Sequence, residues 1–148
     1  MDLFNCMDIS ASGMKAQRAR LNVISMNLAN ANTTRTEDGT PYRRKTTIFQ
    51  TTPVTGSFEE SLRTIEDPLE NQVYGVKVEE IVPVAGEFKK VFDPSHPDAD
   101  EKGYVYMPNV NLVEEMVLML NANRSFEANA AAVKTAKEMA LRALDIGR

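Results

Sequence analysis

The chain has 148 residues, of which 43% are hydrophobic and 26% charged, and its net charge is −4 at pH 7. This length suits one domain, or a small domain with long extensions, and the composition is that of a folded protein. The excess of 21 acidic over 17 basic residues argues against general nucleic-acid binding, and a single cysteine excludes both an internal disulfide and a cysteine-based zinc site.

The sequence shows neither a membrane-spanning segment nor the pattern of a secretory signal. The longest strictly apolar run, residues 116–120, is too short to span a bilayer, so we expect no insertion into lipid. The first residues have neither the basic nor the apolar region of a secretory signal, which predicts that no such signal is cleaved. One histidine and no tryptophan leave little material for catalysis, so we expect neither an enzyme nor a cofactor.

The distribution of proline and aromatic residues divides the chain into three parts. All seven prolines and eight of the ten aromatic residues lie within residues 41–108. Proline ends helices, and aromatic residues suit half-buried strands. The sequence therefore predicts an α+β fold whose terminal helices form a coiled-coil-like pair or bundle, the assembly core, around a small β-rich centre. The predicted parts are an N-terminal helical segment over 1–32, a β-rich central portion over 33–110 and a long C-terminal helix over 111–148.

The N-terminal part shows a seven-residue period typical of a packed helix. Its apolar positions are Leu3, Met7, Met14, Leu21, Ile24 and Leu28. Ser10 and Gln17 interrupt this pattern, and Gly13 costs about 1 kcal/mol relative to alanine, so this helix is expected to be the weaker of the two. It is expected to end within residues 30–34, where asparagine and threonine side chains compete with the backbone for hydrogen bonds.

The central portion is predicted to hold short strands. Residues 43–51 and 74–82 show strand patterns, and shorter strands are expected at 88–92 and 103–107. A turn is expected at 53–57. The basic cluster Arg43-Arg44-Lys45 is interpreted as a solvated strand edge that blocks unwanted pairing.

The C-terminal part carries the strongest period. One row spaced by seven is Leu112, Met119, Phe126, Val133 and Ala140, and its companion row is Met116, Asn123, Ala130, Lys137 and Leu144. Eight of these ten positions are apolar, which predicts a long helix. Asn111 followed by Glu114 resembles a capping box at its start. Asn123 and Lys137 interrupt the second row and are candidates for setting the register.

Two long amphipathic helices have more apolar surface than a centre of this size covers. Val113, Val117 and Leu120 widen the C-terminal stripe further. An exposed apolar stripe of that size usually indicates a partner. The residues therefore predict a subunit of an assembly, and a closed coiled-coil adaptor is an alternative.

The polar segment 93–101 is the one candidate for metal binding or catalysis. A histidine with several carboxylates suits a divalent cation, and a metal-dependent enzyme centred on His96 is therefore a second alternative. Two prolines brace the segment in turn geometry, and the chain has no second histidine. We therefore interpret it as a connecting loop without a bound metal.

Several segments resemble bacterial flagellar axial proteins. Ile9–Met14 and Asn27–Thr34 resemble the signature that these proteins share, and Gly39–Lys45 follows as in the proximal rod branch. The similarity to basal-body rod proteins continues through 93–99, 103–105, 108–111, 115–116, 121–129 and 136–137, and 83–90 is the least similar stretch. The motif residues are Ala29, Asn30, Asn32, Thr33, Asp93, Pro94, His96, Pro97, Asp98, Gly103, Tyr104, Pro108 and Asn109.

The resemblance implies a structural subunit of the flagellar basal-body rod, the drive shaft that crosses the periplasm. Its implied partners are proximal and distal rod proteins, the ring or adaptor at the rod base and the type III export apparatus, which exports such subunits without cleavage. Self-association is expected to be helical and open-ended, since heterologous contacts need not close. The predicted assembly interface is Leu3, Met7, Met14, Leu21, Ile24, Leu28, Leu112, Met116, Met119, Phe126, Val133, Ala140 and Leu144. Another rod subunit of the same family is the closest alternative.

Overall fold

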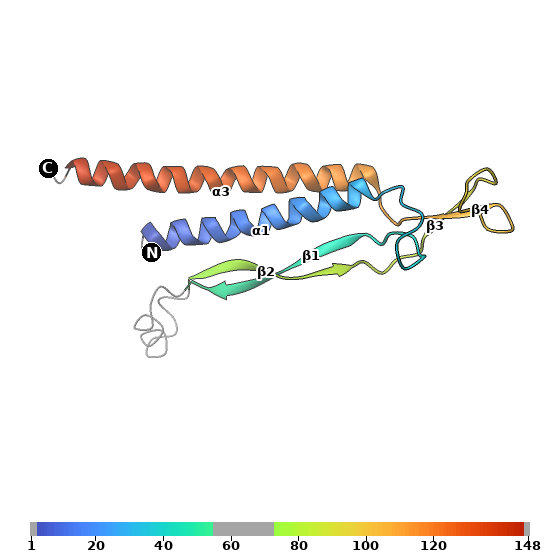
Figure 1. Cartoon of the computed structure of the whole chain (residues 1–148). Helices are drawn as coiled ribbons and strands as arrows, with labels where there is room; N and C mark the ends of the chain where they lie inside the picture. The colour runs from blue at the N-terminus through green and yellow to red at the C-terminus, as the bar shows by residue number, and fades with distance from the viewer. Residues whose placement is uncertain (1–2, 55–72, 147–148) are drawn as a thin grey trace. The chain divides into compact units, whose positions relative to one another are not determined.

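A computed structural model describes residues 3–54 and 73–146 of the chain. Its elements in order are α1 (Leu3–Ala29), β1 (Lys45–Pro53), β2 (Tyr74–Pro83), β3 (Lys89–Phe92), β4 (Tyr104–Met107) and α3 (Leu112–Ile146) (Figure 1). The α+β class with two long terminal helices is confirmed, and each strand begins and ends within two residues of its predicted bounds. Most of the turn predicted at 53–57 lies outside the described residues.

The strands form two ribbons of two strands each within the described part of the chain. β1 pairs with β2. β3 and β4 are antiparallel, with Lys89 opposite Met107 and Phe92 opposite Tyr104. A two-stranded ribbon is marginal alone, so packing against the helices must supply much of the stability of β1–β2.

Contacts group the chain into two compact units. Unit 1 comprises Met1–Ala19, Phe49–Glu79 and Ala122–Arg148, and unit 2 comprises Arg20–Ile48 and Glu80–Asn121. Each unit thus contains a part of both helices and of the β1–β2 ribbon.

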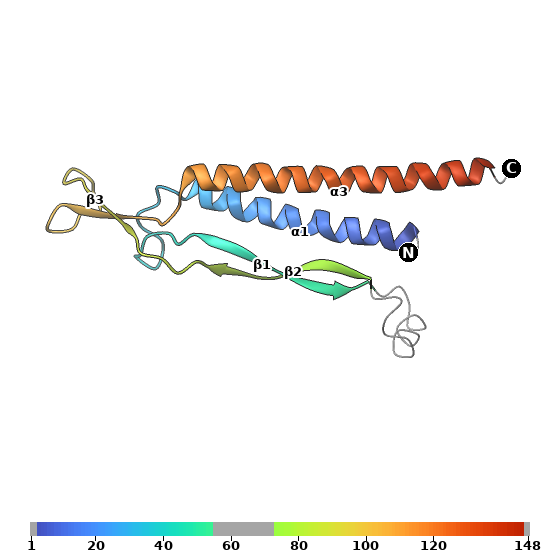
Figure 2. The same ribbon diagram turned by 180° about the vertical axis from the view of Figure 1, so that it is seen from behind.

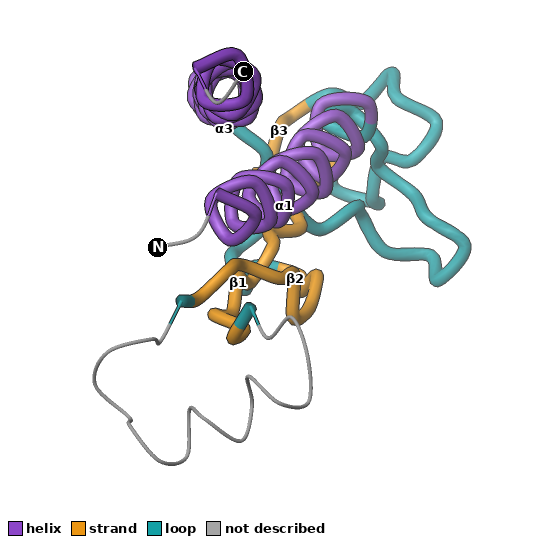
Figure 3. The backbone as a smooth tube through the Cα atoms, turned by 90° about the vertical axis from the view of Figure 1, so that its left-hand side faces the viewer, coloured by secondary structure: helices purple, strands orange, loops and turns teal. Residues whose placement is uncertain are grey.

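In unit 1, α1 lies between α3 and the β-ribbon, as the end-on view shows (Figure 3). On one side, a Cβ added to Gly13 would lie 2.9 Å from Asn129 Nδ2, so the two helices approach closely there. On the other side, Ser12 Oγ accepts a hydrogen bond of 3.1 Å from the Val76 backbone N–H. Gly13 therefore lets α1 pack closely on α3, and the hydrogen-bonded hydroxyl of Ser12 lets its other face pack on β2.

In unit 2, apolar and polar side chains share the interior. The buried apolar residues include Val23, Ile24, Val105 and Val110. The start of α3 is capped by Asn111, whose Oδ1 accepts the Val113 backbone N–H at 3.1 Å, which is an N-cap.

The inward face of α3 differs from the predicted pair of rows. Met119, Phe126, Val133 and Ala140 are half-buried, consistent with the first predicted row. The most buried companions are Glu115, Ala122 and Ala136, one residue before the predicted row, whereas Asn123 and Lys137 are exposed. Asn123 and Lys137 therefore lie outside the seam within this chain, and their role in setting the register of an assembly stays a prediction. Small side chains bring α3 close to its neighbours, and a search for large apolar residues overlooks them.

Neither helix of the described part has the combination of length and apolar character that crossing a membrane requires. The two helices run alongside each other in the portions that each unit contains (Figures 1 and 2).

The close approach of α3 at Ala136 gives a test of this packing. Ala136 is 1% exposed, so Ala136→Leu forces extra carbons into a filled seam and should cost about 1–3 kcal/mol of unfolding free energy. Urea unfolding followed by far-UV circular dichroism measures this cost. Ala132→Leu, at an exposed position of the same helix, is the matched control, and equal effects from the two variants would show that the seam is placed wrongly.

Candidate assembly surface and its buried polar support

Asn27, 1% exposed near the end of α1 in unit 2, joins three parts of the chain. Its Nδ2 donates to the Lys45 carbonyl at 2.8 Å and to Glu115 Oε2 at 3.0 Å. Its Oδ1 accepts the Lys45 backbone N–H at 2.9 Å and the Tyr42 hydroxyl at 3.0 Å. An amide offers two donors and two acceptor positions, so this side chain is fully satisfied and holds α1, β1 and α3 in one arrangement.

Glu115 has no exposed surface and is paired with a cation. Arg44 Nε donates to Glu115 Oε1 at 2.5 Å, and Arg44 Nη2 lies 3.7 Å from the exposed Glu114. A buried carboxylate is tolerated only with such partners. The interpretation of Arg44 as part of a solvated edge is therefore wrong, because its side chain is only 19% exposed and carries this ion pair.

Tyr42 borders the same network. Burial, and next the negative charge of Glu115, raise the pKa of the Tyr42 phenol above its ordinary value of 10.0. The hydroxyl donates to Asn27, which requires the protonated form. The network thus depends on a neutral phenol at ordinary pH.

The motif residues that follow α1 end the helix. Asn30 Nδ2 donates to the Met26 carbonyl at 2.9 Å, and Thr33 Oγ1 donates to Asn30 Oδ1 at 3.2 Å. The Thr33 carbonyl then accepts the Tyr42 backbone N–H at 3.2 Å. Ala29 and Asn32 are exposed. Asn30 and Thr33 therefore position the chain that leads into the network.

The polar loop between β3 and β4 uses its side chains locally. Asp93 Oδ1 accepts the backbone N–H and hydroxyl of Ser95 at 3.1 and 3.0 Å. His96 Nδ1 accepts the Asp98 backbone N–H at 3.1 Å. No three His, Cys, Asp or Glu side chains gather to hold a metal ion within residues 3–54 and 73–146. Pro94 and Pro97 are exposed members of the same loop.

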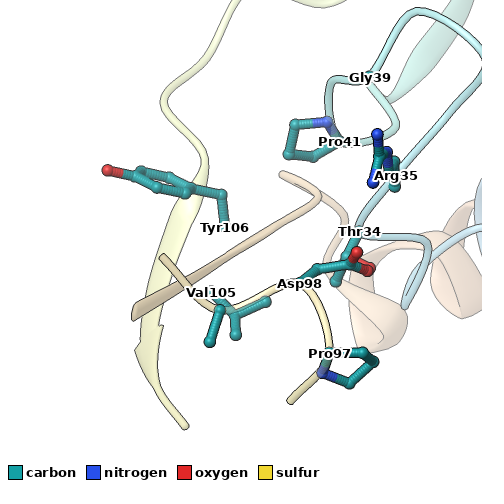
Figure 4. Close-up of a pocket in the computed structure, with 9 residues that line it drawn as sticks. Thr34, Arg35, Gly39, Pro41, Pro97, Asp98, Val105 and Tyr106 are labelled. Carbon is teal, nitrogen blue, oxygen red and sulfur yellow. The ribbon is translucent and has the colours of Figure 1, made fainter. Parts of the chain in front are cut away.

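Asp98 also reaches outside its loop. Thr34 Oγ1 donates to Asp98 Oδ2 at 2.7 Å, and these two residues line a pocket of about 360 Å³ between the 34–41 and 97–106 segments (Figure 4). The carboxylate points toward Thr34 and Arg35 in this view. This contact ties two motif segments together.

The remaining motif residues shape the chain between β3 and α3. Gly103 has φ +76°, and a Cβ there would lie 3.1 Å from Phe92 Cε2, so only glycine suits this position. Tyr104 meets the Phe92 ring edge-on at 5.3 Å. Pro108 is buried, and Asn109 Oδ1 accepts the Arg44 backbone N–H at 3.0 Å. Sequence reasoning named these residues by resemblance. It included Asn27, Tyr42, Arg44 and Glu115 only as members of resembling segments and did not predict that they form one network.

The predicted interface residues fall into two groups in the described chain. The group packed largely within the chain is Met7, Met14, Leu21, Ile24, Leu28, Met119, Phe126, Val133 and Ala140. The group left exposed is Leu112, Met116 and Leu144. The Leu3 side chain lies outside the described part.

The first turns of α3 present a continuous exposed apolar face. Leu112, Val113, Met116, Val117 and Leu120, the α3 apolar face, are between 48% and 70% exposed. Their spacing of one, three and four residues puts them on one side of the helix, and Leu112, three residues before the buried Glu115, lies at the edge of this face. An exposed face of this kind is typical of a protein–protein contact.

Family comparisons identify the class of protein to which this geometry belongs. Residues 7–35 match the family model for flagella basal body rod proteins, and residues 101–146 match the C-terminal model of flagellar basal body rod FlgEFG proteins. The chain is thus of the flagellar rod class. The matched ranges contain the helix-ending motif and all of the α3 apolar face.

Full-length relatives specify the family more closely. The chain is 47% identical to flagellar basal-body rod protein FlgC of Aquifex aeolicus over 94% of this chain and 92% of the relative. It is 44% identical to the Borreliella burgdorferi FlgC over 99% and 98%, and 40% identical to the Bacillus subtilis FlgC over the full length of both. The chain therefore belongs to the FlgC family of flagellar basal-body rod proteins.

The buried and exposed ion pairs of Arg44 predict unequal costs when each is removed. Arg44→Met leaves the Glu115 carboxylate buried without its cation and should cost about 3–5 kcal/mol of unfolding free energy. Glu114→Gln, which alters an exposed pair, should cost less than about 1 kcal/mol. Urea unfolding of both variants provides the comparison, and a small effect of Arg44→Met would contradict the role given to the pair.

The raised pKa of Tyr42 predicts a loss of stability in alkali. Above pH about 10 this phenol is ionised in the unfolded chain but still protonated in the folded chain. The free energy of unfolding therefore falls as pH rises through the folded pKa. Tyr42→Phe should be less stable than wild type at pH about 8 and should lose that part of the alkaline decrease. Urea midpoints across this range measure it, and an unchanged alkaline slope in Tyr42→Phe would count against the assignment.

Proposed function

We propose that this chain is a non-enzymatic structural subunit of the proximal part of the basal-body rod. Membership of the FlgC family supports the rod assignment. We further propose that the subunit polymerises with itself and with other rod proteins through its terminal helices, and that the resulting shaft transmits torque. The flagellar basal body is the corresponding location.

The observation that carries this proposal is the α3 apolar face. Five large apolar side chains remain exposed although the opposite side of the same helix is already packed. Burying a side chain of this size contributes about 1.5–3 kcal/mol, so covering the face by neighbouring protein would give a large driving force. Lateral packing of long helices also supplies the stiffness that a rotating shaft needs.

The roles that we propose for the parts of the chain follow its division into terminal helices and a β-rich centre. We propose that residues 1–32 and 111–148 form the inner assembly core and that 33–110 face outward. The partners would be other proximal and distal rod subunits, the ring or adaptor at the rod base and the type III export apparatus. Export would occur without a cleaved signal, and the assembled rod would cross the periplasm.

A charge placed on the α3 apolar face tests assembly separately from folding. Met116 is 57% exposed, so Met116→Asp should leave the far-UV circular dichroism spectrum of the free chain unchanged. In an assembled rod the same carboxylate would be buried without a partner, and swimming in soft agar should be lost. Met116→Leu, which keeps an apolar side chain, should swim normally, and normal swimming of Met116→Asp would contradict the proposal.

A further inference from the structure

Unit 1 contains an open groove between α1 and β2. The α1–β2 groove has a volume of about 480 Å³ and an apolar lining of Ala11, Ala16, Val76 and Val78. Its polar lining residues are Asp8, Ser12, Lys15 and Lys77. This volume is within the range of roughly 300–1,000 Å³ typical of ligand pockets. Small residues of α1 and valines of β2 thus form a groove wide enough for side chains of another molecule.

The uncharged polar side chain of the groove, Ser12, is already satisfied. Ser12 Oγ donates to the Ile9 carbonyl at 2.7 Å and accepts the Val76 backbone N–H at 3.1 Å. Gly75 allows β2 to approach, because a Cβ there would lie 2.8 Å from Ser12 Oγ. The interior therefore favours apolar side chains over a polar ligand.

The chain itself carries a surface of matching chemistry. The α3 apolar face offers side chains at intervals of four, Leu112–Met116–Leu120 and Val113–Val117, the pattern that a helix uses to fill a groove. The one exposed charge within residues 112–120 is Glu114, since Glu115 is buried. Two cations, Lys15 and Lys77, and one carboxylate, Asp8, line the groove, so the exposed Glu114 meets an environment of complementary charge there.

We infer that the α3 apolar face of one copy docks in the α1–β2 groove of a second copy, with Glu114 beside Lys15. This contact rests on the proposed rod function and deepens it by naming the two surfaces that meet. They are different patches of the chain, so the contact is heterologous, and repetition gives an open assembly unless the rotation closes.

Single-cysteine alleles test the contact in intact rods. Ala11→Cys and Val117→Cys, each with Cys6→Ser and tags of different size, are co-expressed in a strain that lacks the chromosomal gene. Each allele must first restore swimming; if either fails, Ser12→Cys or Val113→Cys replaces it. Basal bodies are isolated and oxidised, and a disulfide forms only where the Cα atoms approach within about 7 Å. We expect a mixed dimer that carries both tags.

The control pairs Ala11→Cys with Ala131→Cys, at another exposed position of α3, and should give no mixed dimer. Intact rods without the dimer from Ala11→Cys and Val117→Cys would overturn this contact and leave the proposed function standing. An adduct between the Ala11→Cys chain and a different rod protein would also overturn it, since the occupant would then not be a second copy.

A charge exchange gives a second, independent readout. Lys15→Glu and Glu114→Lys should each reduce swimming, because each places like charges opposite one another in the contact. The double variant restores the attraction and should swim better than either single variant. Additive loss in the double variant would overturn the pairing.

Discussion

A fully buried carboxylate, Glu115, joins three elements of unit 2. Glu115 has no exposed surface, so its charge must be met by Arg44 and its remaining oxygen by Asn27. Satisfying it requires the end of α1, the start of β1 and the first turn of α3 to meet at one point. The specificity of such a network comes from its partners, because removing one of them leaves the others buried and unsatisfied.

This constraint determines which side of α3 is available to other molecules. Since Glu115 faces inward, the helical period turns Met116, Val117 and Leu120 outward. The buried network that fixes the fold therefore also determines how α3 presents the apolar surface that the proposed rod subunit would use. Folding and assembly occupy opposite sides of one helix, so a substitution on one side should disturb one process with little effect on the other.

Much of the fold follows from the sequence, because long periodic segments predict helices and proline-rich segments end them. The row from Met119 to Ala140 was predicted by its seven-residue spacing. The row containing Ala122 and Ala136 was not, because it begins at the charged Glu115 and the predicted row was placed one residue later, on Met116. A search for small residues at the same spacing would have found it.

The network was harder to predict for a different reason. Asn27, Tyr42, Arg44 and Glu115 are far apart in sequence, and each residue type is usually exposed or locally bonded. Only the tertiary structure places Arg44 beside a buried glutamate rather than at a solvated edge. The family motif pointed to Asn30 and Thr33, whose hydrogen bonds position the chain that leads to Tyr42 and Arg44. It did not indicate that this chain enters a buried network.

The most direct test of the rod assignment is an in-frame deletion of the gene, scored by swimming and by electron microscopy of isolated basal bodies. A rod subunit is required for everything built beyond it, so the account predicts loss of swimming, rod and hook with the membrane ring still present. Intact hook–basal bodies and normal swimming, in a strain with no second copy of the gene, would contradict it.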